Sequence, residues 1–171
     1  MKRIMIIGSG CSGKSTLAIR LGRVLNLPVY HLDRLHWRPG WQETPKSEFH
    51  ALQAQAVAEP EWIVDGNYFG SLEIRLAACD TVVFLDLPTW ICLLGALRRY
   101  LRYRGRTRPD MGEGCNERLS LQYLRWIAVY RRRGRPRILR MLGDLDPSKR
   151  TVILRSRREI ERWVQGLQST R

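Results

Sequence analysis

Short apolar runs alternate along the chain with longer segments whose apolar residues recur at helical spacing. Each run is nearly continuous and apolar or β-branched, which is typical of strands buried on both faces of a parallel sheet. The five runs are residues 4–7, 29–32, 62–64, 81–85 and 151–154. This alternation predicts a three-layer α/β/α fold around a five-stranded parallel sheet.

Helical periodicity is clear after Pro45, after Pro88 and in the last predicted helix. Apolar residues spaced three or four apart share one face of a helix, and we expect these faces to pack into the core. The sets are Phe49, Leu52, Ala56 and Val57, then Leu93, Leu94, Leu97 and Leu101, and finally Ile160, Trp163, Val164 and Leu167. Because no repeat, low-complexity tract or long linker interrupts the pattern, residues 1–171 are expected to form a single domain.

A phosphate-binding motif follows the first apolar run directly. It fits the pattern G-x-x-x-x-G-K-[ST] and consists of Gly8, Ser9, Gly10, Cys11, Ser12, Gly13, Lys14, Ser15 and Thr16. The glycines let backbone N–H groups turn toward a polyphosphate, and the following helix adds partial positive charge at its N-terminus. In this pattern the lysine reaches the β- and γ-phosphates and the next hydroxyl ligates Mg²⁺. We therefore expect ATP and Mg²⁺ to bind here.

Carboxylates follow three of the predicted strands. Asp33, Asp65 and Asp86 come directly after the second, third and fourth runs. Ligands of open parallel sheets bind outside the carboxyl ends of the strands, where the phosphate-binding loop also lies. A single aspartate at such a position often only forms a turn or caps a helix. Three of them beside this loop favour a functional role for at least one, and Asp86 is the weakest candidate because a turn at Leu87-Pro88 follows it.

The chain is strongly basic, with a formal net charge of +14 and only four lysines among its 30 basic residues. Residues 98–140 hold fourteen arginines and three acidic residues. Arginine binds phosphate through two parallel hydrogen bonds, so this region favours a phosphate-handling surface. The same field would attract nucleic acid. A coding bias that replaces lysine with arginine would also enrich arginine, and the composition does not exclude it.

Several classes of protein do not fit the chain. No apolar stretch approaches the roughly 20 residues of a membrane span, and the first apolar run is too short for a signal peptide. The four cysteines (Cys11, Cys79, Cys92 and Cys115) show neither a zinc-site spacing nor a disulfide framework. We expect a cytoplasmic protein.

In sum the chain resembles the P-loop kinases of the adenylate kinase and nucleoside monophosphate kinase group, and most closely the bacterial topology modulation (FlaR-like) proteins. The resemblance covers almost the whole chain. It rests on the phosphate-binding loop and on residues 29–33, 37–41, 62–68, 80–86, 108–117 and 155–157. It implies a Mg-ATP-dependent phosphotransferase that moves the γ-phosphoryl group to a small-molecule acceptor, either a nucleotide or another metabolite.

The resemblance assigns catalytic roles to Lys14 and to two of the aspartates. Asp65 would hold Mg²⁺, or a water on it, together with Ser15. Asp33 lies where related small-metabolite kinases contact the acceptor. With an alcohol as acceptor Asp33 would be the general base, and with a phosphate as acceptor it would only position the substrate.

Residues 33 to about 60 are expected to form the acceptor-binding loop. In this loop Trp37 and Trp41 could form an aromatic wall, and Arg34 could reach a phosphate. The two tryptophans could equally pack the loop onto the rest of the domain. Both alternatives remain open at this point.

Residues from about 98 to 137 are expected to form an Arg-rich helical lid. Arg104 and Arg108 lie in the loop between its two helices and are candidates to neutralise the transferred phosphoryl group. Arg155 and Arg157 follow the last strand and are expected beside the nucleotide base.

Two departures from the family pattern stand out. Adenylate kinases continue after their Asp-Gly with Phe-Pro-Arg, whereas this chain has Asn67-Tyr68-Phe69, and its next arginine is Arg75. This departure disfavours a plain AMP kinase. Asn67 and Tyr68 end a strand on the same rim and could line the acceptor pocket, and Arg75 is a further candidate for acceptor binding. Cys11 replaces a glycine of close relatives, so a positive φ there would strain it.

A nucleic-acid-associated ATPase that affects DNA topology is the alternative function. It would use the basic surface to hold a phosphodiester backbone. Neither a helix-turn-helix nor a zinc finger nor an RNA-binding aromatic motif supports it. The expected partners are therefore ATP and a small-molecule acceptor, with nucleic-acid contact at most nonspecific.

Overall fold

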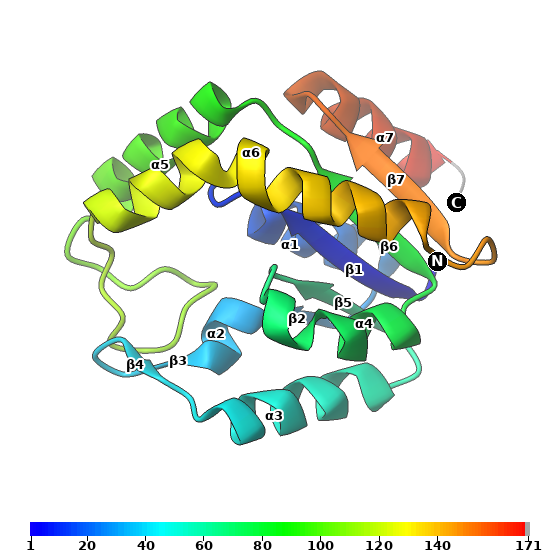
Figure 1. The fold of residues 1–171 in the computed structure, drawn as a ribbon, viewed down its shortest axis with the longest axis horizontal. Coiled ribbons are helices and arrows are strands. Elements are labelled where there is room, and N and C mark those ends of the chain that lie inside the picture. The colour runs from blue at the N-terminus through cyan, green and yellow to red at the C-terminus, as the bar shows by residue number, and fades with distance from the viewer. Residues whose placement is uncertain (170–171) are drawn as a thin grey trace.

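Five parallel strands form the central sheet of the computed structural model, which describes residues 1–169 (Figure 1). Their order across the sheet is β2-β5-β1-β6-β7, so β1 lies in the middle. The strands are β1 (Arg3–Gly8), β2 (Val29–His31), β5 (Trp62–Asp65), β6 (Thr81–Leu85) and β7 (Arg150–Leu154). All five predicted strands are confirmed, except that Leu32 begins a helix instead of ending β2.

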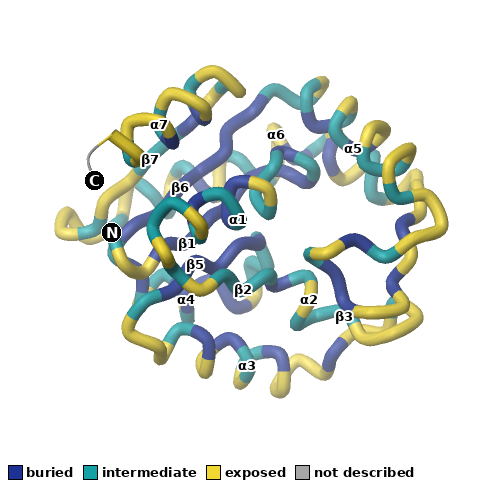
Figure 2. Tube along the Cα trace, turned by 180° about the vertical axis from the view of Figure 1, so that it is seen from behind, coloured by how far each residue is buried: buried dark blue, intermediate teal, exposed yellow. Residues whose placement is uncertain are grey.

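The sheet is covered on both faces, as Figure 2 shows by the buried strands between exposed helices. Alternate residues of β1 belong to two separate cores, because side chains alternate between the faces of a strand. Ile4 and Ile6 pack with α1 (Lys14–Leu25) and α7 (Arg157–Ser169). Met5 and Ile7 pack with residues of three other helices, α3 (Lys46–Ala58), α4 (Leu72–Ala78) and α6 (Leu121–Gly143).

Two irregular regions lie beyond the carboxyl ends of the strands. The first holds α2 (Leu32–His36) and a hairpin of β3 (Trp37–Arg38) and β4 (Gln42–Glu43). The second is the lid loop, residues 104–120, which joins α5 (Thr89–Tyr103) to α6. The two touch each other beside the sheet edge (Figure 1), since the indole of Trp41 donates a 3.1 Å hydrogen bond to the Asn116 carbonyl.

The apolar face predicted for α5 is wrong in part. Leu94, Leu97 and Leu101 are 44%, 47% and 68% exposed, whereas Cys92 and Ala96 are buried. The reason lies in the close approach of α5 to the phosphate-binding loop, because a Cβ on Gly95 would lie only 2.7 Å from the Cys11 carbonyl oxygen. Small residues of α5 therefore pack against the phosphate-binding loop, and the three leucines remain exposed.

None of the helices formed by residues 1–169 has both the length and the apolar character needed to cross a membrane.

Candidate active site

The phosphate-binding loop leads directly into α1, whose N-terminus is free of acidic residues in its first turn. Gly13 occupies the N-cap position with φ 98°, and no described side chain caps the helix. The first amides of α1 are thus available to an anion. Lys14 folds across the loop and donates a 2.9 Å hydrogen bond to the Ser9 carbonyl. Together these groups form a cradle that suits a polyphosphate.

Asn67 holds the start of this loop through its side-chain amide. Its side-chain NH₂ donates to the Gly8 carbonyl at 2.7 Å, and its side-chain oxygen accepts from the Gly8 N–H at 3.0 Å. Both polar groups of the amide are thereby used on one residue of β1. Asn67 also borders the cleft, so that substrate binding by this residue stays a prediction.

Asp65 is buried at the end of β5 and receives a partner on each carboxylate oxygen. The Ser15 hydroxyl donates to Oδ2 at 2.8 Å, and His31 Nδ1 lies 2.5 Å from Oδ1. A hydroxyl beside a carboxylate is an oxygen-only donor set, which suits Mg²⁺. Ser15 and Asp65 are thus brought together as expected and would hold that ion.

His31 received no role from the sequence. Burial opposes its protonation, but the hydrogen bond and negative charge of Asp65 outweigh burial and raise the pKa of His31 above its usual value. The register of the strands could have pointed to this residue, because His31 pairs with Asp65 across the β2–β5 ladder.

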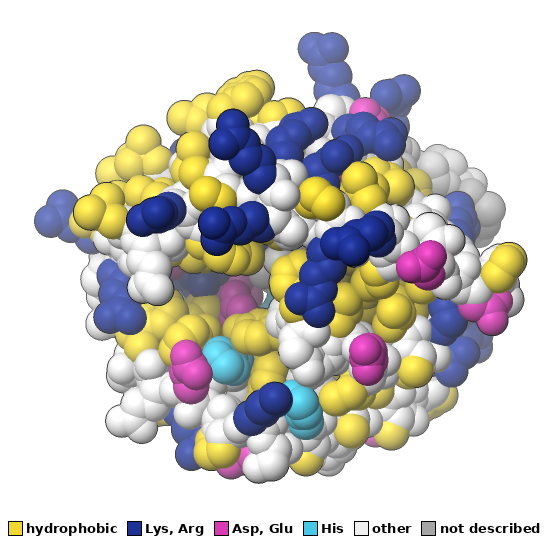
Figure 3. Space-filling model, in the orientation of Figure 1, with side chains coloured by type: hydrophobic (Ala, Val, Ile, Leu, Met, Phe, Trp, Pro, Cys, Tyr) yellow, Lys and Arg dark blue, Asp and Glu magenta, His cyan; other side chains and the backbone are white. Residues whose placement is uncertain are grey.

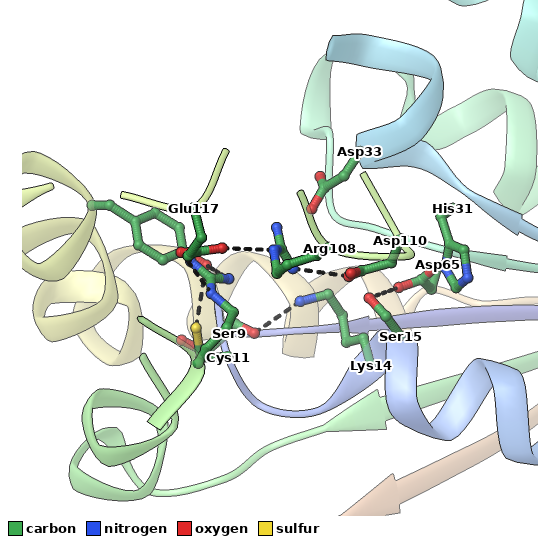
Figure 4. A network of polar contacts seen from close by, with 12 residues as sticks. Ser9, Cys11, Lys14, Ser15, His31, Asp33, Asp65, Arg108, Asp110 and Glu117 are labelled. Carbon is green, nitrogen blue, oxygen red and sulfur yellow. Dashed lines mark hydrogen bonds and ion pairs between the residues drawn. The ribbon is translucent and has the colours of Figure 1, made fainter. Parts of the chain in front are cut away.

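A cleft of about 1270 Å³ opens above the loop, between the hairpin, α5 and the lid loop. Figure 4 shows Lys14 and Ser15 on one side of this space, with Asp33 and Arg108 facing it from the other elements. Predicted residues that border the cleft include Lys14, Asp33, Trp37, Trp41, Asp65, Arg108 and Arg157.

Asp33 and several aromatic residues border the part of the cleft where the acceptor is expected. The Tyr68 hydroxyl donates a 2.7 Å hydrogen bond to Asp33, and burial together with this negative charge raises the pKa of Tyr68. The rings of Trp37 and Trp41 meet edge to face at 5.4 Å. The Arg118 guanidinium lies 4.9 Å from the Trp41 ring. Arg34, which was expected here, does not border the cleft.

Arg75 corrects a second expectation. It is fully buried in α4 and donates to three backbone carbonyls, those of Gly66, Asn67 and Tyr68. Burial lowers the pKa of its guanidinium to about 10. The side chain holds the loop after β5 from behind, so it is not free to bind an acceptor.

Of the two candidate arginines in the lid loop, only Arg108 borders the cleft. Arg108 is only 8% exposed and pairs with Asp110 at 2.9 Å and with Glu117 at 2.7 Å. Arg104 is exposed outside the cleft, with its guanidinium 5.9 Å from the Tyr100 ring. Arg104 is therefore not brought to the phosphate-binding loop in this conformation.

Of the two candidate arginines after β7, only Arg157 borders the cleft. Arg157 reaches the phosphate-binding loop, where its Nη1 lies 2.6 Å from the position of a Cβ on Gly13. The Arg155 side chain is 63% exposed and lies 3.9 Å from Asp86, which Arg135 already binds at 2.8 and 3.0 Å. Asp86 and Arg155 thus form an ion-pair cluster outside the cleft.

Cys11 adopts the left-handed conformation, with φ 56°. Its thiol lies 3.6 Å from the Tyr123 hydroxyl. The strain expected at this position is therefore present.

The similarity of this chain to known proteins lies in its fold. No family model matches the chain. A shikimate kinase of Aquifex aeolicus is 33% identical over 101 residues, which cover 50% of this chain and 60% of that protein. The chain thus spans about 60% of the length of this curated relative.

Solved structures are similar over almost the whole chain. A shikimate kinase from Acinetobacter baumannii in complex with shikimate has a TM-score of 0.58 at 14% identity, covering 99% of this chain and 92% of that one. A shikimate kinase from Bacteroides thetaiotaomicron has a TM-score of 0.55 at 20% identity, covering 99% and 97%. The chain therefore has the α/β fold of the P-loop kinases, in the form that shikimate kinases share.

Proposed function

We propose that this protein is a Mg-ATP-dependent phosphotransferase that acts on the hydroxyl group of a small molecule. The observation that carries the proposal is that Lys14, the Ser15–Asp65 pair and Asp33 border one cleft. A phosphate-binding loop alone is common to many ATPases. Asp33, a carboxylate that borders the same cleft, would supply the general base for transfer to an acceptor hydroxyl.

The nucleotide would lie along the start of α1. Its phosphates would meet the amides of residues 13–16 and the Lys14 ammonium, and Ser15 and Asp65 would hold Mg²⁺. The base would extend between Arg157 and the exposed side of α5 at Leu94, because both border this half of the cleft. This placement gives the exposed leucine an apolar partner.

The acceptor would lie between Asp33 and the tryptophans. Its oxygen attacks the γ-phosphorus as the bond from that phosphorus to the bridging oxygen breaks. The hydroxyl proton passes to Asp33, while Lys14 and Arg108 neutralise charge on the phosphoryl oxygens. Asp33 at the cleft is what favours a hydroxyl acceptor, since a phosphate acceptor needs no general base.

The more specific form of this proposal is that the protein is a member of the topology modulation (FlaR-like) group of these kinases. The basic surface of the chain lies over α5 and α6, where arginine side chains gather above the cleft (Figure 3). α6 carries seven arginines and no acidic residue. We expect this field to attract nucleic acid only nonspecifically, with affinity that falls steeply between 50 and 200 mM salt.

ADP formation from Mg-ATP tests the proposal. The acceptor panel would hold nucleosides, nucleoside monophosphates, sugars and small hydroxy acids, with Lys14→Ala as the blank. We expect one class of hydroxyl acceptor to raise turnover many-fold over the acceptor-free rate. Slow hydrolysis that no acceptor changes, but that DNA or RNA stimulates, would contradict the proposal and support the regulator.

A further inference from the structure

Glu117 is a buried carboxylate placed between two arginines of the cleft. Its side chain is 2% exposed. Oε1 accepts a 3.1 Å hydrogen bond from Arg99 Nε and lies 3.0 Å from Arg99 Nη2, while Oε2 lies 2.7 Å from Arg108 Nε. All three residues border the cleft. The role expected for the lid arginines does not account for this carboxylate.

The contacts continue from Glu117 to the phosphate-binding loop. Arg99 donates from Nη1 to the Tyr123 hydroxyl at 3.3 Å and lies over the Tyr123 ring at 5.0 Å. That hydroxyl is 3.6 Å from the Cys11 thiol and 2.5 Å from the position of a Cβ on Gly10. Figure 4 shows this polar network connecting the lid loop to the loop that would hold phosphate.

The charges indicate why the network has a carboxylate at its centre. Two guanidinium groups close together repel each other, and a buried anion between them removes the repulsion, here through a hydrogen bond from Arg99 and an ion pair with Arg108. Arg108 also donates from Nη1 to Asp110 at 2.9 Å, and Asp110 borders the cleft as well. Glu117 thus pairs with Nε of Arg108, while Asp110 occupies Nη1, the donor that a phosphate oxygen would take in its place.

We propose that Glu117 is a positioning residue that sets Arg108 against the phosphate-binding loop, so that Arg108 exchanges Asp110 for the γ-phosphate of the bound nucleotide. The inference rests on the proposed function for the identity of the nucleotide. Glu117 itself touches neither nucleotide nor acceptor. Its effect on nucleotide binding is therefore expected to depend on the γ-phosphate, the group that Arg108 would meet.

Calorimetric titration with two magnesium nucleotides, ADP and the non-hydrolysable β,γ-imido analogue of ATP, tests this role without needing an acceptor. Glu117→Gln should weaken binding of the analogue about tenfold and that of ADP less than twofold, since only the analogue carries a γ-phosphate. Glu117→Asp keeps the charge and should restore part of the loss. Glu113→Gln removes an exposed glutamate of the same loop and should change neither affinity.

A double-mutant cycle shows whether Glu117 acts through Arg108. If it does, adding Glu117→Gln to Arg108→Met costs no further affinity for the analogue. Equal weakening of both nucleotides, an unchanged analogue affinity or fully additive losses would each overturn the role. If Glu117→Gln fails to fold by circular dichroism, Glu117→Asp carries the same comparison.

These outcomes separate the two proposals. A wild-type protein that binds the analogue but phosphorylates no acceptor fails the proposed transfer, while the selectivity measurement still decides the role of Glu117. An active wild type with unchanged selectivity in Glu117→Gln overturns the role of Glu117 alone. A wild type that binds neither nucleotide overturns both.

Discussion

Tyr68 donates a 2.7 Å hydrogen bond to Asp33, joining the loop after β5 to the first turn of α2. The two residues follow different strands and come together at the acceptor side of the cleft. A hydroxyl that donates a hydrogen bond to a carboxylate fixes the orientation of that carboxylate. Tyr68 therefore orients the carboxylate of Asp33, the proposed general base.

Asp33→Asn tests this assignment directly. We expect kcat for the transfer to fall about 10²- to 10⁴-fold, the usual contribution of a general base, while the affinity for Mg-ATP changes less than twofold. Tyr68→Phe removes only the orienting bond and should lower kcat about tenfold. Steady-state kinetics and nucleotide titration measure both quantities. Loss of ATP affinity with an unchanged kcat in Asp33→Asn would place this carboxylate on the nucleotide side instead.

The hydrogen bond from Ser15 to Asp65 leads to a prediction about magnesium. If both oxygens hold the ion or its waters, Ser15→Ala and Asp65→Asn should each raise the Mg²⁺ concentration needed for half-maximal turnover, by about tenfold or more. A magnesium titration at saturating ATP measures this value. Ser148→Ala, at an exposed serine distant in sequence, is the matched control. Magnesium dependence that is the same in all four proteins would rule out this pair as the ligands.

The fold and the phosphate-binding part of the site could be predicted because they depend on local sequence. Continuous apolar runs specify the strands, and the glycine-rich loop specifies its own conformation between β1 and α1. The positive φ of Cys11 follows from the same loop geometry. These features need no knowledge of distant contacts.

Side-chain roles that depend on tertiary contacts could not be predicted in the same way. Arg75 looked free to bind an acceptor, but its position on α4 places it under the loop after β5, where three carbonyls need donors. Asn67 is drawn to the backbone of Gly8, and Leu94 is left exposed because α5 approaches the phosphate-binding loop through Gly95. Each outcome depends on how elements far apart in sequence pack together.

Arg75→Met should destabilise the protein by about 3 kcal/mol, because three buried carbonyls lose their donor and each unpaired group costs about 1–3 kcal/mol before relaxation. Arg75→Lys keeps a charge but cannot reach all three carbonyls, so a smaller loss is expected. Urea denaturation gives the free energy of unfolding of each variant. Arg162→Met changes an exposed arginine of α7 and should have little effect. An Arg75→Met protein as stable as this control would show that the three bonds contribute nothing net.

His36 provides a prediction about pH. Its ring packs against those of Trp37, Phe49 and Tyr68, and burial lowers its pKa below the usual value. The unfolded chain therefore binds a proton at this residue more readily than the folded protein does. As the pH falls from 7 toward 5, this difference removes stability, since protonation favours the unfolded state. His31, whose pKa is raised, contributes with the opposite sign.

The variant His36→Phe keeps an aromatic ring in the cluster and removes the titrating group. We expect the free energy of unfolding to fall less between pH 7 and pH 5 in His36→Phe than in the wild type, because the other titrating groups, His31 included, are common to both proteins. Urea denaturation of the two proteins at both pH values measures the difference. The same loss in both would show that His36 is protonated as readily in the folded protein as in the unfolded chain. That result would mean that the ring cluster beside the acceptor side of the cleft admits water to this imidazole.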